Sequence, residues 1–269
     1  MNNLTKHPCF EDKAHFHYGR LHLPVAPACN IECSYCERKF DCPNEARPGV
    51  TSNVMSETEA LDYAHNYLRQ HSETTVVGIA GPGEPLVNPS TFAVLAKLEG
   101  IIKCVSTNGL LLPKRVDQLQ NCGVTALTVT INTLLPSTAM QLYKGVDAKL
   151  LLRCQQQGAA LAIQKGMSVK INTVLVSGVN NTEIEVVAIA EFAASIGASV
   201  MNLNALIPAG ALRNSEAPNK HRLLHLREVA SKYIRQSHNC KQCRADAAGI
   251  PGEECRSAPE ANQDIKAKI

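Results

Sequence analysis

The chain has 269 residues, which is enough for one large α/β domain with a substantial core. Its formal net charge of +3 is too small to indicate a nucleic-acid partner, and with 5 Phe, 6 Tyr and no Trp we expect no aromatic platform for stacking bases. The 11 cysteines occur without a secretion signal at the start and without a segment of transmembrane length. We therefore expect a cytoplasmic protein whose clustered cysteines bind metal rather than form disulfides.

The first 20 residues are polar and irregular, and they include Cys9. A lone cysteine in an N-terminal arm often has no function. A short strand is predicted over 21–28, and it leads directly into a cysteine-rich loop. His22 lies on this strand and can face the loop, although a histidine beside a strand is more often an ordinary hydrogen-bonded residue.

The cysteine-rich loop has the spacing Cys29-x3-Cys33-x2-Cys36, with Tyr35 directly before the third cysteine. Three thiolates can hold three irons of a cubane cluster, which leaves the fourth iron open to a substrate. A zinc knuckle is the alternative, but no nearby fourth ligand completes a tetrahedron. The loop resembles that of the radical S-adenosylmethionine (SAM) superfamily. In that superfamily the open iron binds SAM, and one electron from the cluster cleaves it to a 5′-deoxyadenosyl radical.

Strands and helices alternate after this loop. Capping boxes at Ser56 with Glu59 and at Thr182 with Glu185 mark two helix starts. We predict strands at 21–28, 75–80, 101–106, 124–132, 168–176 and 199–207, and helices at 56–71, 89–98, 113–123, 133–165 with a break near Gly145, 182–197 and 218–236. This alternation predicts an α/β fold: a partial TIM-type (βα)6 barrel with parallel strands and functional groups at the carboxyl ends of its strands.

Three of the predicted strands carry polar residues at alternate positions, where a fully buried parallel strand would be apolar. These residues are Thr128, Thr130 and Asn132, then Lys170 and Asn172, then Asn202 and Asn204. A solvent-facing side of the sheet would explain the pattern, but outer helices favour a barrel lumen that holds a polar ligand.

A glycine-rich turn, Gly81-Pro82-Gly83-Glu84-Pro85, ends the second predicted strand. It resembles the radical SAM turn that binds the amino group of SAM, although its second position is Pro. Glycine also lets the backbone approach a ligand closely. The cofactor contacts that we predict are Tyr35, Gly81, Gly83, Glu84, Asn108, Thr130, Asn132 and Asn172.

Two more cysteines, Cys240 and Cys243, form a C-x2-C pair after the last predicted helix. No second C-x2-C pair is present to complete a zinc site. The two cysteines therefore bind a metal together with ligands from another part of the chain, share a cluster or have no functional role. The sequence thus divides into an arm at 1–20, a barrel at 21–237 and a tail at 238–269.

Taken together, several motifs resemble the NifB family, the radical SAM proteins that build the nitrogenase cofactor precursor. They lie at 7–10, 23–30, 38–42, 44–50 and 243–247, and the resemblance spans about 6–254. Glu84 stands where the family pattern has Asp, and the residue before Pro136 is not the expected Asp. Many members carry a further C-terminal domain, so the resemblance implies the form without it.

The resemblance implies three clusters. Cys29, Cys33 and Cys36 would hold the SAM-cleaving one. Two further [4Fe–4S] clusters would be substrates, one held by His22, Cys42 and Cys104 and the other by Cys9, Cys240 and Cys243. Three further cysteines match no ligand position: Cys122, Cys154 and Cys255.

The implied reaction begins with transfer of a methyl group from SAM to a cluster sulfide. Hydrogen abstraction by the adenosyl radical and further loss of protons and electrons leave a carbide as the substrate clusters fuse and gain one sulfur. Glu45 and Arg47 would be catalytic in handling protons or anchoring charge, although an ordinary loop salt bridge is an equal alternative. Implied partners are proteins for cluster delivery and later nitrogenase cofactor assembly and a low-potential electron donor, with no nucleic acid and no membrane.

Two other functions remain open at this stage. One is a different radical SAM enzyme that uses Cys9 and the C-terminal pair for auxiliary clusters, but electron relays do not need a strand histidine. The other is a non-enzymatic iron–sulfur carrier or scaffold. The turn at 81–84 argues against that function, because a carrier needs no SAM site.

Overall fold

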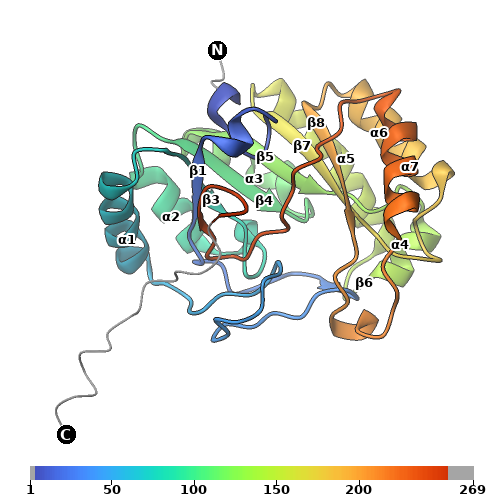
Figure 1. Ribbon diagram of the computed structural model, residues 1–269, viewed down its shortest axis with the longest axis horizontal. Helices are drawn as coiled ribbons and strands as arrows, with labels where there is room; N and C mark the ends of the chain where they lie inside the picture. The colour runs from blue at the N-terminus through green and yellow to red at the C-terminus, as the bar shows by residue number, and fades with distance from the viewer. Residues whose placement is uncertain (1–3, 254–269) are drawn as a thin grey trace, which may run out of the picture.

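A curved seven-stranded sheet forms the centre of the computed structural model, in the order β8-β7-β5-β4-β3-β1-β9 (Figure 1). The structure describes residues 4–253, and Cys255 lies outside them. The strands of the sheet are β1 (Gly19–His22), β3 (Thr74–Ile79), β4 (Ile102–Thr107), β5 (Val124–Thr130), β7 (Ser168–Leu175), β8 (Val200–Ala205) and β9 (Ala248–Gly249). Neighbours from β8 to β1 are parallel, and only β9 pairs antiparallel within this sheet. The predicted partial (βα)6 barrel is confirmed.

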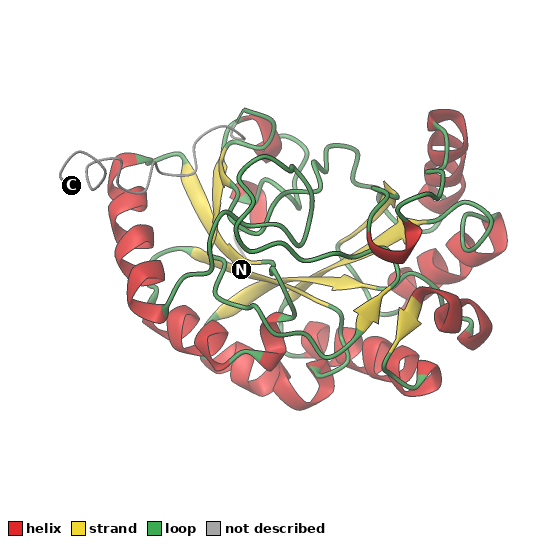
Figure 2. Ribbon diagram, turned by 90° about the horizontal axis from the view of Figure 1, so that it is seen from below, coloured by secondary structure: helices red, strands yellow, loops and turns green. Residues whose placement is uncertain are grey.

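The helices cover one face of the curved sheet, and loops fill the other side (Figure 2). They are α1 (Glu57–Gln70), α2 (Pro89–Lys97), α3 (Leu112–Asn121), α4 (Pro136–Leu142), α5 (Ala148–Gln164), α6 (Glu183–Ser195) and α7 (Lys220–Ser231), with short 3-10 helices η1 (Leu4–Lys6), η2 (Ala14–Phe16), η3 (Pro85–Val87) and η4 (Gly210–Leu212). Both predicted helix starts are confirmed, because the Ser56 and Thr182 hydroxyls each accept a hydrogen bond from the third helical N–H.

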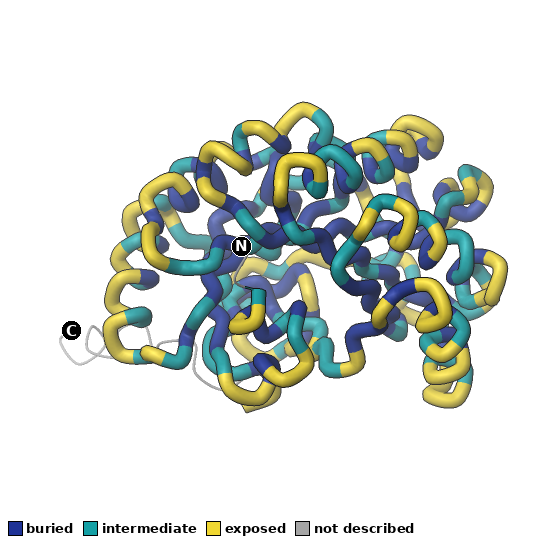
Figure 3. The backbone as a smooth tube through the Cα atoms, turned by 90° about the horizontal axis from the view of Figure 1, so that it is seen from above, coloured by how far each residue is buried: buried dark blue, intermediate teal, exposed yellow. Residues whose placement is uncertain are grey.

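The strands alternate between an apolar face and a polar face. On β5, Leu127 and Val129 are fully buried against the helices, whereas Thr128 and Thr130 point into the lumen and line a cavity. Figure 3 shows the same division, with buried residues along the sheet and exposed residues on the outer sides of the helices. The predicted lumen position is confirmed for Thr128, Thr130, Lys170, Asn172 and Asn204, whereas Asn132 and Asn202 do not line the cavity.

Several short features differ from the prediction. The first strand ends at His22 instead of continuing to residue 28, because Pro24 has no N–H to donate to a ladder. A two-stranded ribbon joins β2 (Glu32–Cys33) to β6 (Tyr143–Lys144), at the predicted break between two helices. No helix within residues 4–253 has both the length and the apolar character needed to cross a membrane.

Candidate functional site

A cavity of about 600 Å³ occupies the lumen of the sheet. Its wall combines residues of the N-terminal arm, the three-cysteine loop, the strands and the tail. Predicted site residues in the wall are Cys9, His22, Cys29, Cys33, Tyr35, Cys36, Arg47, Gly83, Glu84, Cys104, Asn108, Thr130, Asn172, Cys240 and Cys243. Four predicted residues lie outside the wall: Cys42, Glu45, Gly81 and Asn132.

The three-cysteine loop is held in place by backbone pairing. Cys33 belongs to β2, which pairs with β6, and the next N–H, of Ser34, donates to the Leu142 carbonyl at 2.8 Å. Burial raises the pKa of Cys33 and Cys36, and each of these thiols also interacts electrostatically with Cys29. All three cysteines line the same cavity. A cubane would bind each of them at a different iron.

The glycine-rich turn packs directly on the backbone that precedes the three cysteines. The Gly83 N–H donates to the Ala26 carbonyl at 2.6 Å, and the Glu84 N–H donates to the Ala28 carbonyl at 2.8 Å. A Cβ atom on Gly83 would lie 2.3 Å from the Ala28 oxygen, so only glycine fits. Asn88 reinforces this contact, because its side-chain amide bonds both the N–H and the carbonyl of Ala28.

The Glu84 carboxylate is buried at the carboxyl ends of β3 and β4. One oxygen accepts hydrogen bonds from the Leu86 N–H at 3.0 Å and the Thr107 hydroxyl at 2.6 Å. The other oxygen accepts from the Asn108 N–H at 2.7 Å. Burial raises the pKa of Glu84, and these hydrogen bonds oppose the rise. The side chain thus fixes the rim of the cavity next to the three-cysteine loop.

The lumen-facing polar residues are organised by hydrogen bonds. The side-chain oxygen Oδ1 of Asn172 accepts from the side-chain amides of Asn202 at 2.8 Å and Asn204 at 3.0 Å. Asn132 is fully buried and donates to the Tyr35 hydroxyl at 2.8 Å. It supports the tyrosine from behind and does not itself reach the cavity wall.

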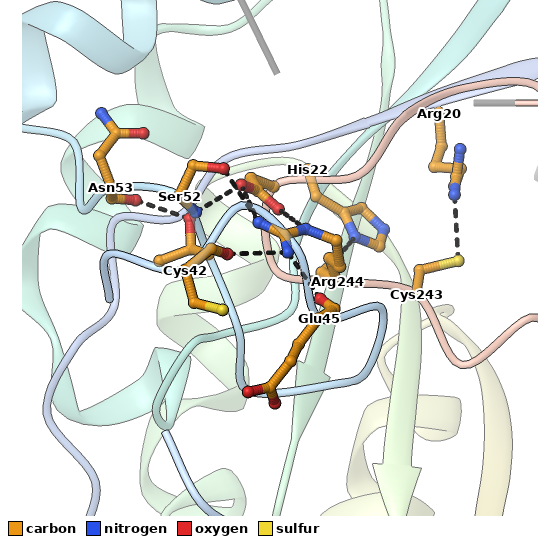
Figure 4. A network of polar contacts seen from close by, with 10 residues as sticks. Arg20, His22, Cys42, Glu45, Ser52, Asn53, Cys243 and Arg244 are labelled. Atoms are coloured by element: carbon orange, nitrogen blue, oxygen red, sulfur yellow. Dashed lines mark hydrogen bonds and ion pairs between the residues drawn. The ribbon is translucent and has the colours of Figure 1, made fainter. Parts of the chain in front are cut away.

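His22 has the tautomer that a metal ligand needs. Its Nδ1 lies 3.0 Å from the Arg244 carbonyl oxygen, which can only accept, so Nδ1 carries the proton (Figure 4). The Nε2 lone pair is then free to bind iron. Burial lowers the pKa of His22 to about 4, which keeps the ring neutral. Gly78 leaves room for the ring, since a Cβ atom there would lie 3.1 Å from its Cδ2.

Cys42 lies in the loop beside the cavity and is half-buried. Its N–H donates to the Thr51 carbonyl, and its own carbonyl accepts from the Arg244 guanidinium at 2.9 Å. The same guanidinium donates to the Glu45 carbonyl at 2.6 Å and to the Asp246 carboxylate at 2.8 Å. Arg244 therefore joins the tail to this loop, and it also bonds His22 (Figure 4).

The remaining cysteines come from the arm, β4 and the tail. Burial raises the pKa of Cys104 to about 12, and the nearby Cys9 contributes to the rise. Burial also raises the pKa of Cys243 to about 12, with Cys9 and Cys240 contributing to the rise. The Arg20 guanidinium donates to the Cys243 sulfur at 3.0 Å (Figure 4). The family resemblance groups Cys9 with Cys240 and Cys243, and all three line the same cavity.

Glu45 and Arg47, the two loop residues predicted to be catalytic, form an ordinary ion pair. The Arg47 Nε lies 2.8 Å from a Glu45 oxygen, and Glu45 also pairs with Lys39. Arg47 reaches the cavity wall and donates to the Glu37 carbonyl at 2.6 Å. The salt-bridge alternative of the sequence analysis is thus present, and it anchors one side of the cavity.

Three buried basic residues of the wall were not predicted as site residues: His7, Arg20 and Lys170. The Cys9 N–H donates to His7 Nδ1 at 3.1 Å, and within residues 4–253 His7 Nε2 has no hydrogen-bond partner. Lys170 was expected only as a polar lumen position. Its basic character among apolar strand residues was the available clue, because lysine is almost never fully buried without a partner.

Comparison with known proteins gives three kinds of similarity. Residues 23–189 match the radical SAM superfamily. Over 93% of this chain, the sequence is 41% identical to the FeMo cofactor biosynthesis protein NifB of Methanocaldococcus infernus and covers 87% of that protein. It is 39% identical to the same-named protein of Chlorobaculum tepidum and 36% identical to that of Azotobacter vinelandii, of which it spans 63% and 54%.

Solved structures share the fold at low sequence identity. Streptococcus suis SuiB bound to precursor peptide SuiA aligns with a TM-score of 0.63 and 16% identity, over 85% of this chain and 51% of that one. The FeFe-hydrogenase maturase HydG from Carboxydothermus hydrogenoformans aligns with a TM-score of 0.58, over 81% of this chain and 52% of that one. These likenesses support the partial barrel and not a particular reaction.

Proposed function

Because the chain belongs to the radical SAM superfamily and, within it, to the NifB family, we propose that it fuses two [4Fe–4S] substrate clusters into the eight-iron precursor of the nitrogenase cofactor. The fusion inserts a carbide derived from SAM and one additional sulfur. The observation that best supports this is a single cavity lined by cysteines from the arm, the three-cysteine loop, β4 and the tail. SAM cleavage alone would need only the loop.

Cys29, Cys33 and Cys36 would hold the resident cluster. When bound, that cluster supplies the electron that cleaves SAM. The chain positions this cluster, because the turn at Gly83 and Glu84 holds the three-cysteine loop against the carboxyl ends of β3 and β4. The polar lumen residues, including Thr130 and Asn172, offer hydrogen-bonding groups to a polar cofactor in the same space.

The substrate clusters would lie deeper in the lumen. Cys9, Cys240 and Cys243 would hold one, with the Arg20 N–H group donating to the Cys243 sulfur. His22, Cys42 and Cys104 would hold the other. Neutral imidazole is displaced from iron more readily than thiolate, so His22 can release its cluster during fusion. The electrostatic contact between Cys9 and Cys104 supports placing the two substrates side by side.

The product would pass to proteins that complete the nitrogenase cofactor. We also propose a low-potential electron donor and proteins that deliver clusters as partners, following the role named for the relatives. A radical SAM enzyme with fixed auxiliary clusters is the alternative that the experiment below addresses.

Anaerobic iron counting on the reconstituted protein tests this function. We expect ~12 irons per chain in the wild type, from three cubanes. Cys9→Ala and Cys240→Ala should each lose ~4 irons, as one cluster leaves. Cys122→Ala is the matched control, because Cys122 is buried at the end of α3, away from the cavity wall. A wild-type content of ~4 irons, unchanged in the variants, would overturn the proposal.

Cys42→Ala is the most demanding variant, because Cys42 lies outside the cavity wall. We expect it to lose ~4 irons, like the other two variants. Full iron content in Cys42→Ala would remove this residue from the ligand set.

To distinguish substrates from fixed relays, the loaded protein is then treated with SAM and dithionite. Conversion of two cubane signals into one larger cluster supports fusion, whereas two cubanes that persist favour auxiliary relays.

A further inference from the structure

We propose that Lys170 is the countercharge that holds the substrate cluster of Cys9, Cys240 and Cys243 in position next to Cys104. The inference rests on the proposed function and deepens it, because it names a positioning residue for one substrate. Lys170 is on none of the motifs that resemble the family. It is identified by its burial, its contacts and its strand position.

Lys170 lies near the start of β7, on the lumen face of the sheet. It is 5% exposed and lines the cavity. In the sheet register it pairs with Thr128 on β5, and Thr128 pairs with Ser106 on β4. Residues two apart on a strand share a face, so Cys104 points into the lumen beside this layer. The strand geometry therefore directs the ammonium group and the Cys104 thiol into the same space.

The contacts of the ammonium group do not neutralise its charge. Lys170 Nζ lies 3.4 Å from the Cys9 carbonyl oxygen and 5.5 Å from the centroid of the Phe10 ring. Within residues 4–253, no carboxylate forms an ion pair with it. The ionisable side chains around it are four cysteines, two from the tail and one each from the arm and β4, together with His7 and His22. A buried cation without an anion destabilises a fold, which calls for an anion in the cavity.

The proposed substrate supplies that anion. The thiolates of Cys9, Cys240 and Cys243 outweigh the positive charge of an oxidised cubane core, so the cluster that they bind is negative. The ammonium group can also donate hydrogen bonds to its sulfides. Lys170 is thus unfavourable in the metal-free chain and favourable once the cluster is bound. A lysine with a purely structural role would stabilise both states.

Three variants test the inference in the full chain. Lys170→Met removes the charge and keeps the length of the side chain, and Lys170→Arg keeps the charge. Lys103→Met is the matched control. Lys103 is also buried and lies near the start of β4, but it faces the helices and donates to the Cys122 carbonyl at 2.8 Å. For each variant, iron per chain is counted after anaerobic reconstitution, and the midpoint of thermal unfolding is measured without metal.

We expect Lys170→Met to raise the metal-free midpoint by about 2–4 °C and to lower the iron content from ~12 to ~8 per chain. Lys170→Arg should retain ~12 irons. Lys103→Met should do the reverse of Lys170→Met, lowering the midpoint while retaining ~12 irons, because it leaves a buried carbonyl unpaired.

Two results would overturn the inference while leaving the proposed function intact. One is a Lys170→Met protein that keeps ~12 irons. The other is a Lys170→Met protein whose metal-free midpoint falls, since iron loss would then follow from a damaged fold. A wild-type content of ~4 irons is different, because it overturns the proposed function and the inference together.

Discussion

Glu84 connects two strand ends through one carboxylate. Its two oxygens accept three hydrogen bonds, from the backbone N–H groups of Leu86 and Asn108 and from the Thr107 hydroxyl. In Glu84→Gln, the amide NH2 would face at least one of these donors. We expect the variant to lose about 1–3 kcal/mol of unfolding free energy, the penalty of leaving a buried donor unpaired. Chemical denaturation of the metal-free protein measures it.

The exposed Glu99 provides the control for this substitution. Glu99→Gln should leave the denaturation curve within about 0.5 kcal/mol of the wild type, as surface substitutions usually do. Equal stability of the two variants would show that the Glu84 carboxylate does not tie the strands together. The turn would then depend on its backbone contacts alone.

Individual ligand candidates were predictable to different degrees. Spacing alone identified Cys29, Cys33 and Cys36, because a short loop places them together whatever the rest of the fold does. Cys9 was predictable only through the family resemblance, since its neighbours in space come from the tail. Lys170 was not predictable as a cavity residue beside the cysteines, because only the fold determines which ionisable side chains surround it.

At the scale of elements, the glycine turn and the three-cysteine loop form one packed unit. Gly83 lies so close to the carbonyls of residues 26–28 that an added Cβ would overlap rigid backbone. An added Cβ at Gly78 meets the end of the His22 side chain, which can shift. We expect Gly83→Ala to lose about 4 kcal/mol or more and Gly78→Ala less than about 2 kcal/mol.

Denaturation of both metal-free variants, side by side, measures this difference. Gly78→Ala should also lose iron on reconstitution, because the His22 ring moves away from its ligand position. Similar stability losses in the two variants would contradict the packing argument. Full iron content in Gly78→Ala would show that His22 is not a ligand of the cluster.

The tail attaches to the barrel through Asp246. Burial raises its pKa, but hydrogen bonds from Arg244 and Ser52 outweigh burial, so the pKa lies below its usual value. A depressed pKa stabilises the fold above the unfolded-state pKa, and this stability is lost as the pH falls through the folded-state pKa. We expect Asp246→Asn to lose about 1–3 kcal/mol at pH 7 and to have a weaker dependence of stability on pH below about 4.

Denaturation of the metal-free protein at a series of pH values measures both effects. Asp117→Asn is the control, because Asp117 forms an exposed ion pair with Lys165 on the helical side. Its variant should match the wild type at every pH, since exposed ion pairs contribute little. If the stability of the Asp246→Asn protein depended on pH as that of the wild type does, the Asp246 carboxylate would not attach the tail to the barrel.

Long elements were predictable and short ones were not. The βα units follow local patterns of apolar residues, capping boxes and glycines, and the structure reproduces them within a few residues. The two-residue strands β2, β6 and β9 carry no such pattern. They form because partners distant in the sequence supply their hydrogen bonds. The ribbon of β2 and β6 holds Cys33 in the cavity wall.

At the scale of the whole molecule, the cavity wall joins segments that have little else in common. The arm, the three-cysteine loop and the tail each contribute cysteines, so bound clusters would crosslink them. Ligands that bind only the folded state stabilise it by mass action. We therefore expect chelation of iron to lower the thermal midpoint and to loosen these three segments more than the helices.

Limited trypsin digestion of loaded and iron-stripped protein measures the local effect. Arg38 in the loop and Lys241 in the tail are exposed, so both bonds are accessible once the segments open. Cleavage there should accelerate about tenfold or more after iron removal, as the open state gains at least about 1.4 kcal/mol. Cleavage at Arg115 on α3 should not change, because that helix packs on the far face of the sheet. Equal acceleration at all three bonds would indicate global unfolding, and no acceleration would show that the clusters do not connect these segments.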